Sequence, residues 1–197
     1  MKKIVLATNN RNKAVEIKQL LEGWDIEVLT LQDYPGLEMP GEDRPDFAGN
    51  AAKKAEAVAS YTGLPAMADD SGLEVDALGG RPGVRSARYA GENSSDRENN
   101  ELLLKELAGL PPEERGARFR CAVAMAVPGK ETRVVEGSCP GRIAEKPDGE
   151  GGFGYDPVFI YEPEGITFAR MSSEAKNRVS HRGKALQKAR KLLKELL

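Results

Sequence analysis

Several residue types that build common functional sites are scarce in this sequence. His181 is the only histidine, which excludes a zinc site made of several histidines. Cys121 and Cys139 are too few for a disulfide framework, lack the spacing of metal-finger ligands, and are not good nucleophile candidates. No apolar run approaches the length of a transmembrane helix. The 29 basic residues against 31 acidic ones leave no excess charge that would attract nucleic acid or a membrane.

The composition is that of a folded globular protein. Hydrophobic residues make up 40% and charged residues 30% of the chain. Its 197 residues suit a single α/β domain over 1–197, with room for two lobes. The chain passes from Met1-Lys2-Lys3 directly into a short strand-like segment, which is too short for the core of a signal peptide. We therefore expect a cytoplasmic location.

A polar loop joins the first expected strand to the first expected helix. Residues 3–7 read as a buried parallel strand, and an apolar stripe predicts a helix that ends at Gly23. A loop that leads into a helix N-terminus suits phosphate, because unpaired N–H groups and the helix dipole point into it. The loop residues are Thr8, Asn9, Asn10, Arg11, Asn12 and Lys13. The alternative is an Asn-rich turn in which Asn12 caps the helix.

Two adjacent carboxylates, Asp69 and Asp70, follow a short apolar strand that we expect to end at Ala68. Adjacent acids resist burial, so they need a cation, a hydrogen-bond network or open solvent. A divalent metal ion bound by both carboxylates is the most specific of these three possibilities, and Ser71 adds a hydroxyl donor. The alternative is a structural turn between two strands, which the sequence Asp-Asp-Ser-Gly also favours.

A proline-containing loop over residues 32–45 follows the second expected strand, 26–31. Loops of this length inside compact domains are often functional. Glu42 is therefore a candidate second metal carboxylate, with a solvated loop acid as the alternative.

The next helix is expected to be capped by Asp46 and to end at Gly63. Asn50 and Lys54 lie four residues apart, so both project from one side of this helix. If that side faces Asp70, Lys54 can reach a phosphate.

The second half of the chain predicts a meander of strands. A helix is expected over 95–107, and strands are expected over 73–77, 118–127, 133–138 and 141–145, with Gly141 at a turn. Because strands occur both in βα alternation and in this meander, we predict a mixed sheet.

Two later stretches carry further candidate residues. Residues 149–157 combine glycines with aromatic residues and suit close approach to a flat ligand, with Phe153 free to stack on a base. Residues 172–184 are expected to open a single final helix, with His181 at its charged start. Glycine-rich turns are common, and a lone histidine at a helix start is more often structural.

Taken together, six motifs resemble those of the inosine triphosphate pyrophosphatase family, the noncanonical purine nucleoside triphosphate pyrophosphatases. In order they are TNNRNK from residue 8, NAAKKA from 50, ADDSGL from 68, PGVRSARY from 82, GGFGYDP from 151 and SHRG from 180. The resemblance spans nearly the whole chain, and six motifs in order rarely arise together by chance. It implies an α/β fold in which an elongated mixed β-sheet flanked by helices forms two lobes, with the active site in the cleft between them. It also implies a homodimer, and hydrolysis of ITP, dITP and XTP to a nucleoside monophosphate and pyrophosphate.

The resemblance further implies a role for each matching residue. Thr8 to Lys13 and Lys54 would cradle the triphosphate, and Glu42, Asp69 and Asp70 would hold Mg²⁺, with Asp70 also the general base on water. Ser71 would contact the substrate. The nucleoside would be bound by Phe153, Gly154, Tyr155, Asp156, Lys176, His181 and Arg182, with Phe153 stacking and the last two near the purine six-position. One departure concerns the loop after Glu42, which reads Asp43-Arg44-Pro45-Asp46 where the family more usually has a glycine and then a threonine or serine.

Two other functions are consistent with part of these patterns. A non-catalytic nucleotide- or RNA-binding module would use the basic loop and Phe153 without needing Asp69 and Asp70. The Maf-like pyrophosphatases are nearest in shape, but their motifs fit less well. A nicotinamide-dependent oxidoreductase is disfavoured, because the first strand leads into an Asn-rich loop and not into Gly-x-Gly-x-x-Gly.

Overall fold

The computed structural model describes residues 2–196. The chain divides into two compact units. Unit 1 takes the residues up to Asp70, Cys121–Gly137 and the segment from Lys184 onward. Unit 2 takes Ser71–Arg120 and Ser138–Gly183. Each unit is therefore assembled from segments that are far apart in the sequence.

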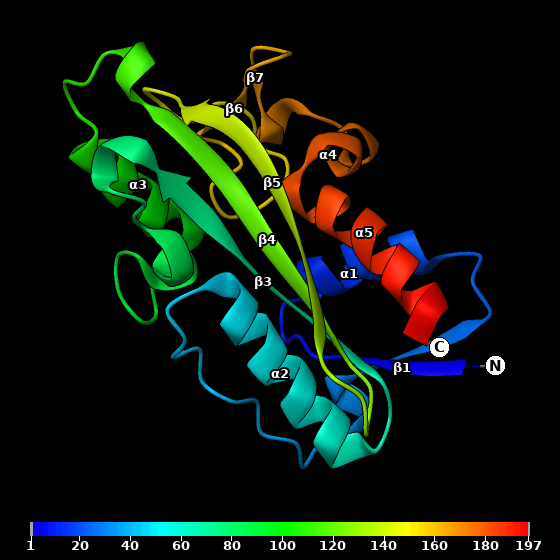
Figure 1. Cartoon of the computed structure of the whole chain (residues 1–197). Helices are drawn as coiled ribbons and strands as arrows, with labels where there is room; N and C mark the ends of the chain where they lie inside the picture. Colours follow the sequence, from blue (N-terminus) through cyan, green and yellow to red (C-terminus); the bar gives the residue numbers. More distant parts are fainter. Residues whose placement is uncertain (1, 197) are drawn as a thin grey trace. The chain divides into compact units, whose positions relative to one another are not determined.

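The strands form one seven-stranded sheet in the order β2-β1-β3-β4-β5-β6-β7 (Figure 1). The strands are β1 (Lys2–Leu6), β2 (Ile26–Thr30), β3 (Ala66–Val75), β4 (Gly116–Ala126), β5 (Arg133–Ile143), β6 (Phe159–Tyr161) and β7 (Ile166–Thr167). The helices are α1 (Arg11–Leu21), α2 (Phe47–Thr62), α3 (Asp96–Glu106), α4 (Ser173–Val179) and α5 (His181–Leu196). Strand β1 pairs in parallel with β2 and β3, whereas β6 pairs antiparallel with β5 and β7. The predicted mixed sheet is confirmed.

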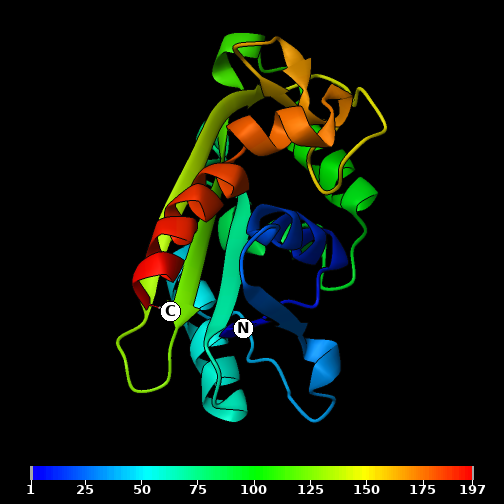
Figure 2. The same ribbon diagram turned by 90° about the vertical axis from the view of Figure 1, so that its right-hand side faces the viewer.

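In unit 1, helices cover both faces of the strands. The views in Figures 1 and 2 place α1 and α5 on one face and α2 on the other. Side chains of a strand alternate between faces, so one set packs against α1 and α5, and buried neighbours such as Val5 and Ala68 face the other way. The first set forms a core from Ile4, Leu6 and Met67 with Ile17 and Leu21 of α1 and Ala185, Leu186, Ala189 and Leu193 of α5.

The caps that begin α1 and α2 explain where these helices start. The Asn10 side chain accepts hydrogen bonds from the backbone N–H groups of Asn12 and Lys13, so Asn10 rather than Asn12 is the N-cap of α1. Asp46 caps α2 through the Gly49 N–H at 2.7 Å, as predicted.

Unit 2 has an aromatic core. Phe119 lies with its ring centroid 4.6 Å from Phe159 and 5.8 Å from Phe168, and all three are buried. The buried guanidinium of Arg115 donates to three backbone carbonyl oxygens, those of Leu107, Ile143 and Ala144, at 2.7 to 2.9 Å.

The expected end of a strand at Ala68 is wrong. Strand β3 runs unbroken from Ala66 to Val75, so Asp69 and Asp70 lie inside it, and the predicted hairpin strand after Gly72 is its continuation. The Asp-Asp-Ser-Gly sequence favours a turn locally, but pairing along the sheet overrides local propensity when the acids find partners.

Two further boundaries differ from the sequence predictions. Strand β5 is continuous, and Gly141 lies within it. Glycine is needed at this position because a Cβ there would collide with the Ile160 carbonyl oxygen of β6. The predicted single helix over 172–184 and beyond is two helices, because Ser180 adopts an extended conformation at φ −67° and ψ 158°.

No helix within residues 2–196 has the length and apolar character that crossing a membrane would require.

Candidate active site

The two adjacent acids of β3 are compensated by lysines from different helices. Lys13 of α1 lies with its ammonium 3.1 Å from a carboxylate oxygen of Asp69, and Lys54 of α2 lies 3.6 Å from one of Asp70. Adjacent residues of a strand point to opposite faces, and α1 and α2 lie on opposite faces of these strands. The burial of two neighbouring carboxylates is therefore balanced by one cation on each side of the sheet.

Lys54 is the centre of the cluster on the α2 face. Its Nζ donates to Glu42 Oε1 at 2.8 Å and to the backbone carbonyl oxygen of Asp69 at 2.8 Å, besides its ion pair with Asp70. The side chain is 9% exposed. This side of α2 does face Asp70, which was the condition for Lys54 to reach a phosphate, and Glu42 and Asp70 both approach the Lys54 ammonium.

The pKa values of this cluster shift in a common direction. Burial raises the pKa of Asp70 above its ordinary value, and the charge of Glu42 adds to the rise although Lys54 opposes it. Burial alone would lower the pKa of Lys54, but the charges of Asp70 and Glu42 outweigh it and raise that pKa. Both shifts fit a site where the carboxylates Glu42, Asp69 and Asp70 outnumber the ammonium groups of Lys13 and Lys54.

The loop that carries Glu42 is held by α2. Lys53 Nζ donates to the Gly41 carbonyl oxygen at 3.0 Å and to Asp43 at 2.8 Å. The buried Asn50 side chain accepts the Arg44 N–H at 3.0 Å. These contacts were missed by the sequence analysis, although the helical spacing of residues 50, 53 and 54 could have indicated a common face. Asp43, in the loop that departs from the usual family pattern, pairs with Lys53.

The donor set suits a hard cation such as Mg²⁺. Glu42 and Asp70 supply oxygen ligands that converge from a loop and a strand, and the excess of carboxylates favours an added positive charge. Within residues 2–196, no three His, Cys, Asp or Glu side chains gather closely enough to form a ready-made metal cluster. Asp69 is directed at Lys13. A metal ion here would therefore need further ligands from substrate or water.

The predicted phosphate loop lies where the sequence placed it, between β1 and α1. Asn9, Arg11 and Asn12 are exposed, and Thr8 and Lys13 are half-buried. The Thr8 hydroxyl accepts the Asn10 N–H at 3.2 Å, and Asn10 caps the helix. The loop thus presents a helix N-terminus together with the exposed charge of Arg11, while the Lys13 ammonium is paired with Asp69.

The predicted nucleoside residues of unit 2 form a second cluster around Phe153. The buried Asp156 accepts from Lys176 Nζ at 2.6 Å and from the Phe153 N–H at 2.9 Å. Lys176 Nζ lies 4.7 Å from the centre of the half-buried Phe153 ring, and the Arg182 guanidinium lies 5.6 Å from it. Two cationic groups therefore lie close to the aromatic ring.

His181 and Arg182 start α5 and are both buried. The His181 ring stacks on Phe119 at 4.6 Å with an interplanar angle of 9°, and Arg182 donates to the Ser71 hydroxyl at 2.9 Å. The structure thus brings Ser71, predicted as a substrate contact, to one of the predicted nucleoside residues.

Tyr155 has a structural contact that the sequence did not predict. Its hydroxyl donates to the Ser86 carbonyl oxygen at 2.8 Å, and burial raises its pKa. The Ser86 hydroxyl in turn accepts the Leu73 N–H at 2.9 Å. Ser86 belongs to the fourth motif, and the structure explains its presence there as a link between β3 and the segment that carries Phe153.

Comparison with known proteins places the chain in one family. The model of the Ham1 family matches residues 4–192. The chain belongs to the Ham1 family. It is 54% identical over 188 residues to a dITP/XTP pyrophosphatase of Geobacillus kaustophilus, covering 95% of this chain and 92% of that protein. It is 50% identical to a dITP/XTP pyrophosphatase of Bacillus subtilis, covering 98% of each.

Solved structures of Ham1 proteins have the same fold. A HAM1 protein from Coxiella burnetii superposes with a TM-score of 0.91 at 38% identity, covering 99% of this chain and 100% of that one. A nucleoside-triphosphatase / dITP/XTP pyrophosphatase from Mycobacterium abscessus superposes with a TM-score of 0.80 at 44% identity, covering 95% and 98%. The resemblance inferred from the six motifs is confirmed.

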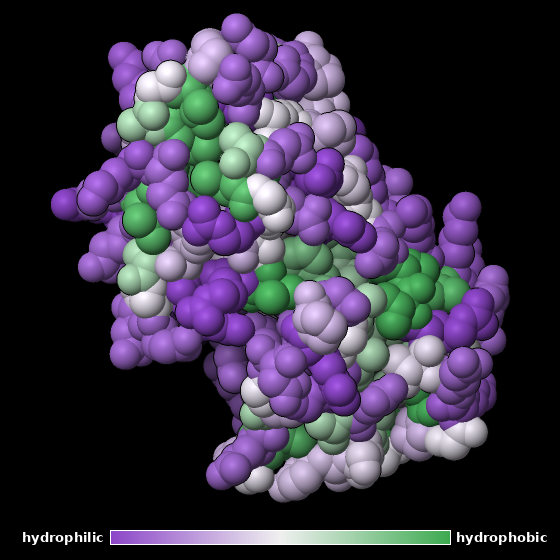
Figure 3. Space-filling model, turned by 60° about the vertical axis from the view of Figure 1, so that its left-hand side comes forward, coloured by the Kyte–Doolittle hydropathy of each residue, from purple (hydrophilic) through white to green (hydrophobic). Residues whose placement is uncertain are grey.

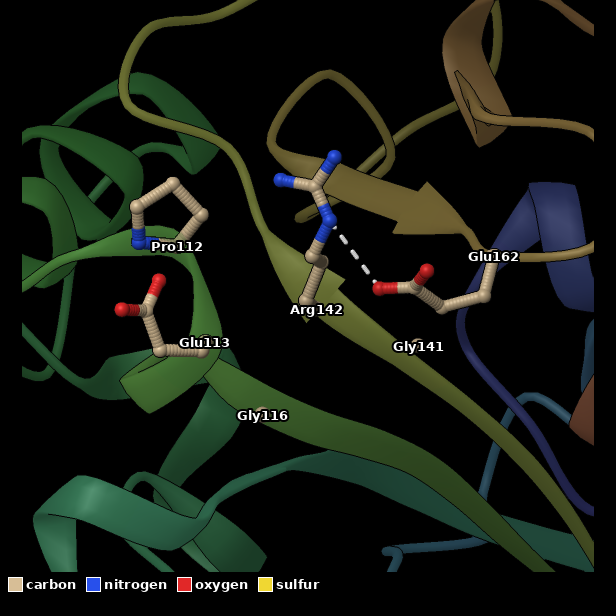
Figure 4. A pocket seen from close by; sticks show the side chains of 6 residues that line it. All are labelled: Pro112, Glu113, Gly116, Gly141, Arg142 and Glu162. Atoms are coloured by element: carbon tan, nitrogen blue, oxygen red, sulfur yellow. Dashed lines mark ion pairs between the residues drawn. The ribbon is translucent and has the colours of Figure 1, made fainter.

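A hollow elsewhere in unit 2 contains none of the candidate residues of this Ham1-family chain. It has a volume of about 390 Å³, and Figure 4 shows the ion pair of Arg142 with Glu162 across it at 3.0 Å. It is lined by Pro112, Glu113, Gly116, Gly141, Arg142 and Glu162. Its two carboxylates would repel a polyphosphate, so we do not assign the substrate to it.

Proposed function

We propose that this Ham1-family protein hydrolyses the noncanonical purine nucleoside triphosphates ITP, dITP and XTP to a nucleoside monophosphate and pyrophosphate. The dITP/XTP pyrophosphatases of Geobacillus kaustophilus and Bacillus subtilis match it over nearly their full length. The observation that carries the proposal is the convergence of Glu42 and Asp70 on Lys54. The two carboxylates can bind a metal ion and accept a proton, and the lysine ammonium beside them can bind a phosphate.

The cluster of unit 1 is assigned the triphosphate. The loop from Thr8 to Lys13, exposed over residues 9–12, offers backbone N–H groups, amides and charge at a helix N-terminus. Lys54 adds a nearly buried ammonium group, which binds phosphate more strongly than an exposed one because it is desolvated.

Asp70 is assigned the role of general base. It would take a proton from the water that attacks the α-phosphorus, while the bond from that phosphorus to the bridging oxygen breaks and pyrophosphate leaves. The raised pKa of Asp70 favours this role, since a more basic carboxylate accepts a proton more readily. Glu42 and Asp70 would hold Mg²⁺, which when bound supplies neutralisation of charge on the phosphate oxygens.

The cluster of unit 2 is assigned the nucleoside. Phe153 offers a face for the base, and His181 and Arg182 offer N–H donors for the six-keto oxygen of hypoxanthine or xanthine. Adenine carries an amino group there, so a buried donor would face another donor at a cost of about 1 to 3 kcal/mol. We therefore expect kcat/KM to be about one to two decades higher for ITP than for ATP. Equal values for the two would contradict the assigned donors.

Product analysis tests the reaction. Phosphorus NMR of an ITP digest with Mg²⁺ is expected to show inosine monophosphate and pyrophosphate in equal amounts. IDP and orthophosphate as first products would refute attack at the α-phosphorus, and absence of turnover would favour a binding module. A parallel digest of pyrimidine and other modified nucleotides separates this function from that of a Maf-like pyrophosphatase.

We further expect a homodimer in the cytoplasm. Figure 3 shows hydrophobic residues gathered in patches on one face of the surface, among hydrophilic ones. The exposed large hydrophobic residues include Val15, Tyr61, Val134 and Ile166. Light scattering of the purified protein tests the dimer, and a mass of one chain at micromolar concentration would contradict it.

A further inference from the structure

We propose that Asp96 and Asn100 of helix α3 are positioning residues for nucleoside binding, because they fix the backbone next to Phe153. The inference rests on the proposed function, in which Phe153 receives the base. Neither residue belongs to the motifs that the sequence analysis assigned to the substrate.

Both polar groups of Gly154 are held by α3. The Gly154 N–H donates to Asp96 Oδ2 at 2.6 Å, and Asn100 Nδ2 donates to the Gly154 carbonyl oxygen at 2.9 Å. Asp96 and Asn100 lie four residues apart, so they project from one side of the helix. Gly154 has φ +62°, a conformation that a residue with a side chain rarely adopts. Two residues one turn apart on α3 therefore hold Gly154, next to Phe153, in a defined backbone conformation.

The other side of Phe153 is held as well. Its own N–H donates to Asp156 Oδ2 at 2.9 Å. Gly152 makes room for this contact, because a Cβ at that position would collide with the same carboxylate oxygen. The backbone of Phe153 is thus fixed on both sides, which orders the ring before a base arrives. Preorganisation of this kind improves binding because less freedom is lost on association.

Asn100 contributes less to folding than its burial suggests. It is 7% exposed, and its Oδ1 accepts no hydrogen bond from the described residues. A buried acceptor without a partner costs stability. Leucine is close in size to asparagine, so Asn100→Leu removes this unfavourable acceptor together with the bond to Gly154. The two effects on stability oppose each other.

The neighbouring Asn99 provides a matched control. Its side chain accepts from the Ala90 N–H and the Ser94 hydroxyl, both at 2.8 Å, and donates to the Ala87 carbonyl oxygen at 3.3 Å. These three hydrogen bonds hold the segment before α3, and none of them goes to Gly154. Asn99→Leu is therefore expected to lower Tm, with a smaller change in KM than Asn100→Leu.

Steady-state kinetics of Asn100→Leu test the proposal. We expect KM for ITP to rise about three- to tenfold, which corresponds to the loss of one hydrogen bond, with kcat nearly unchanged. The inhibition constant of inorganic tripolyphosphate, which has no base, should stay at its wild-type value. Tm should stay close to that of the wild type. An NMR titration with inosine monophosphate should show weaker binding by the same factor as KM.

Variants of Asp96 supply a second test. Asp96→Asn keeps an oxygen acceptor for the Gly154 N–H and should retain the wild-type KM. Asp96→Ala removes the acceptor, so KM for ITP should rise and the Gly154 amide should exchange faster with solvent.

An unchanged KM in Asn100→Leu would overturn the proposal. So would an equal weakening of ITP and tripolyphosphate binding, which would indicate general distortion. A wild-type protein that does not turn over ITP would refute the proposed function instead. In that case wild-type affinity for inosine monophosphate in Asn100→Leu would refute the positioning role, and weaker affinity would support it.

Discussion

Replacing Asp70 with Asn separates the chemistry of this carboxylate from its part in folding. The substitution changes size little but removes the assigned base and one of the two carboxylates that would hold Mg²⁺. General-base catalysis is worth about two to four decades in rate, and the loss of a metal ligand adds to this. We therefore expect kcat for ITP to fall by at least about a hundredfold.

The same substitution should not lower stability at neutral pH. Burial raises the pKa of Asp70 in the folded protein above its unfolded value near 3.8, so the fold disfavours the ionised form. The stability that the fold gains from protonated Asp70 is fully present below the pKa of the unfolded chain. It is lost as pH rises through the pKa of the folded protein. Above its folded pKa the wild type has lost this stability, whereas the uncharged Asn of the variant never titrates. Tm of Asp70→Asn at pH 7 should therefore equal or exceed that of the wild type, and the gap should narrow toward pH 4.

Pyrophosphate release and differential scanning fluorimetry between pH 4 and 8 measure the two effects on one preparation. Asp69→Asn is the matched control, because Asp69 is the neighbouring acid on the opposite face of β3 and is paired with Lys13. It should lower Tm and reduce kcat less than Asp70→Asn does. If Asp70→Asn unfolds at lower temperature and keeps a near-normal kcat per folded molecule, Asp70 is a structural aspartate and the assignment is wrong.

Three further predictions test other parts of the molecule. Lys13→Ala should raise KM for ITP and also lower Tm, because it removes the ammonium group that compensates Asp69. Adding Asp69→Asn to this variant should restore Tm but not KM. Restoration of both would refute contact of Lys13 with the phosphates. Arg115→Met leaves three buried backbone carbonyl oxygens without their donor and should lower the free energy of unfolding in urea by about 3 kcal/mol or more, with Arg115→Lys intermediate. Chelation with EDTA should stop pyrophosphate release and added Mg²⁺ should restore it, whereas full activity in excess EDTA would argue against a metal.

The parts of the fold that follow from local periodicity were predicted correctly. The apolar spacing of α1, α2 and α3 and the Asp46 cap are properties of short segments. The boundaries that were wrong depend on residues distant in the sequence. Gly141 reads as a turn until its close approach to Ile160 of the neighbouring strand is known. Likewise, β3 reads as ending at Ala68 until the lysines that compensate its acids are known.

The candidate site shows the same division. Helical spacing predicted that Asn50 and Lys54 share one side of α2, but only the folded structure shows that this side faces Asp70. The hydrogen bonds from Asn100 and Asp96 of α3 to Gly154 could not be predicted, because 54 and 58 residues separate the partners. Neither an exposed Asp nor a buried Asn indicates such a contact in the sequence. Family motifs identify residues that would contact the substrate, whereas the residues that hold them in place are recognised only in the folded structure.

The interleaving of the two units has a consequence for biosynthesis. The apolar strands of unit 1 leave the ribosome early, yet Ala185, Leu186, Ala189 and Leu193, which complete their core, are made last. At a translation speed of about 5 to 20 residues per second, the nascent chain spends several seconds with Met125 synthesised and α5 still missing. During this interval the strand face that α5 will cover stays open to chaperones and to other nascent chains. A prematurely terminated product would keep that face open permanently, so this architecture makes loss of the last helix a defect that cellular quality control can detect.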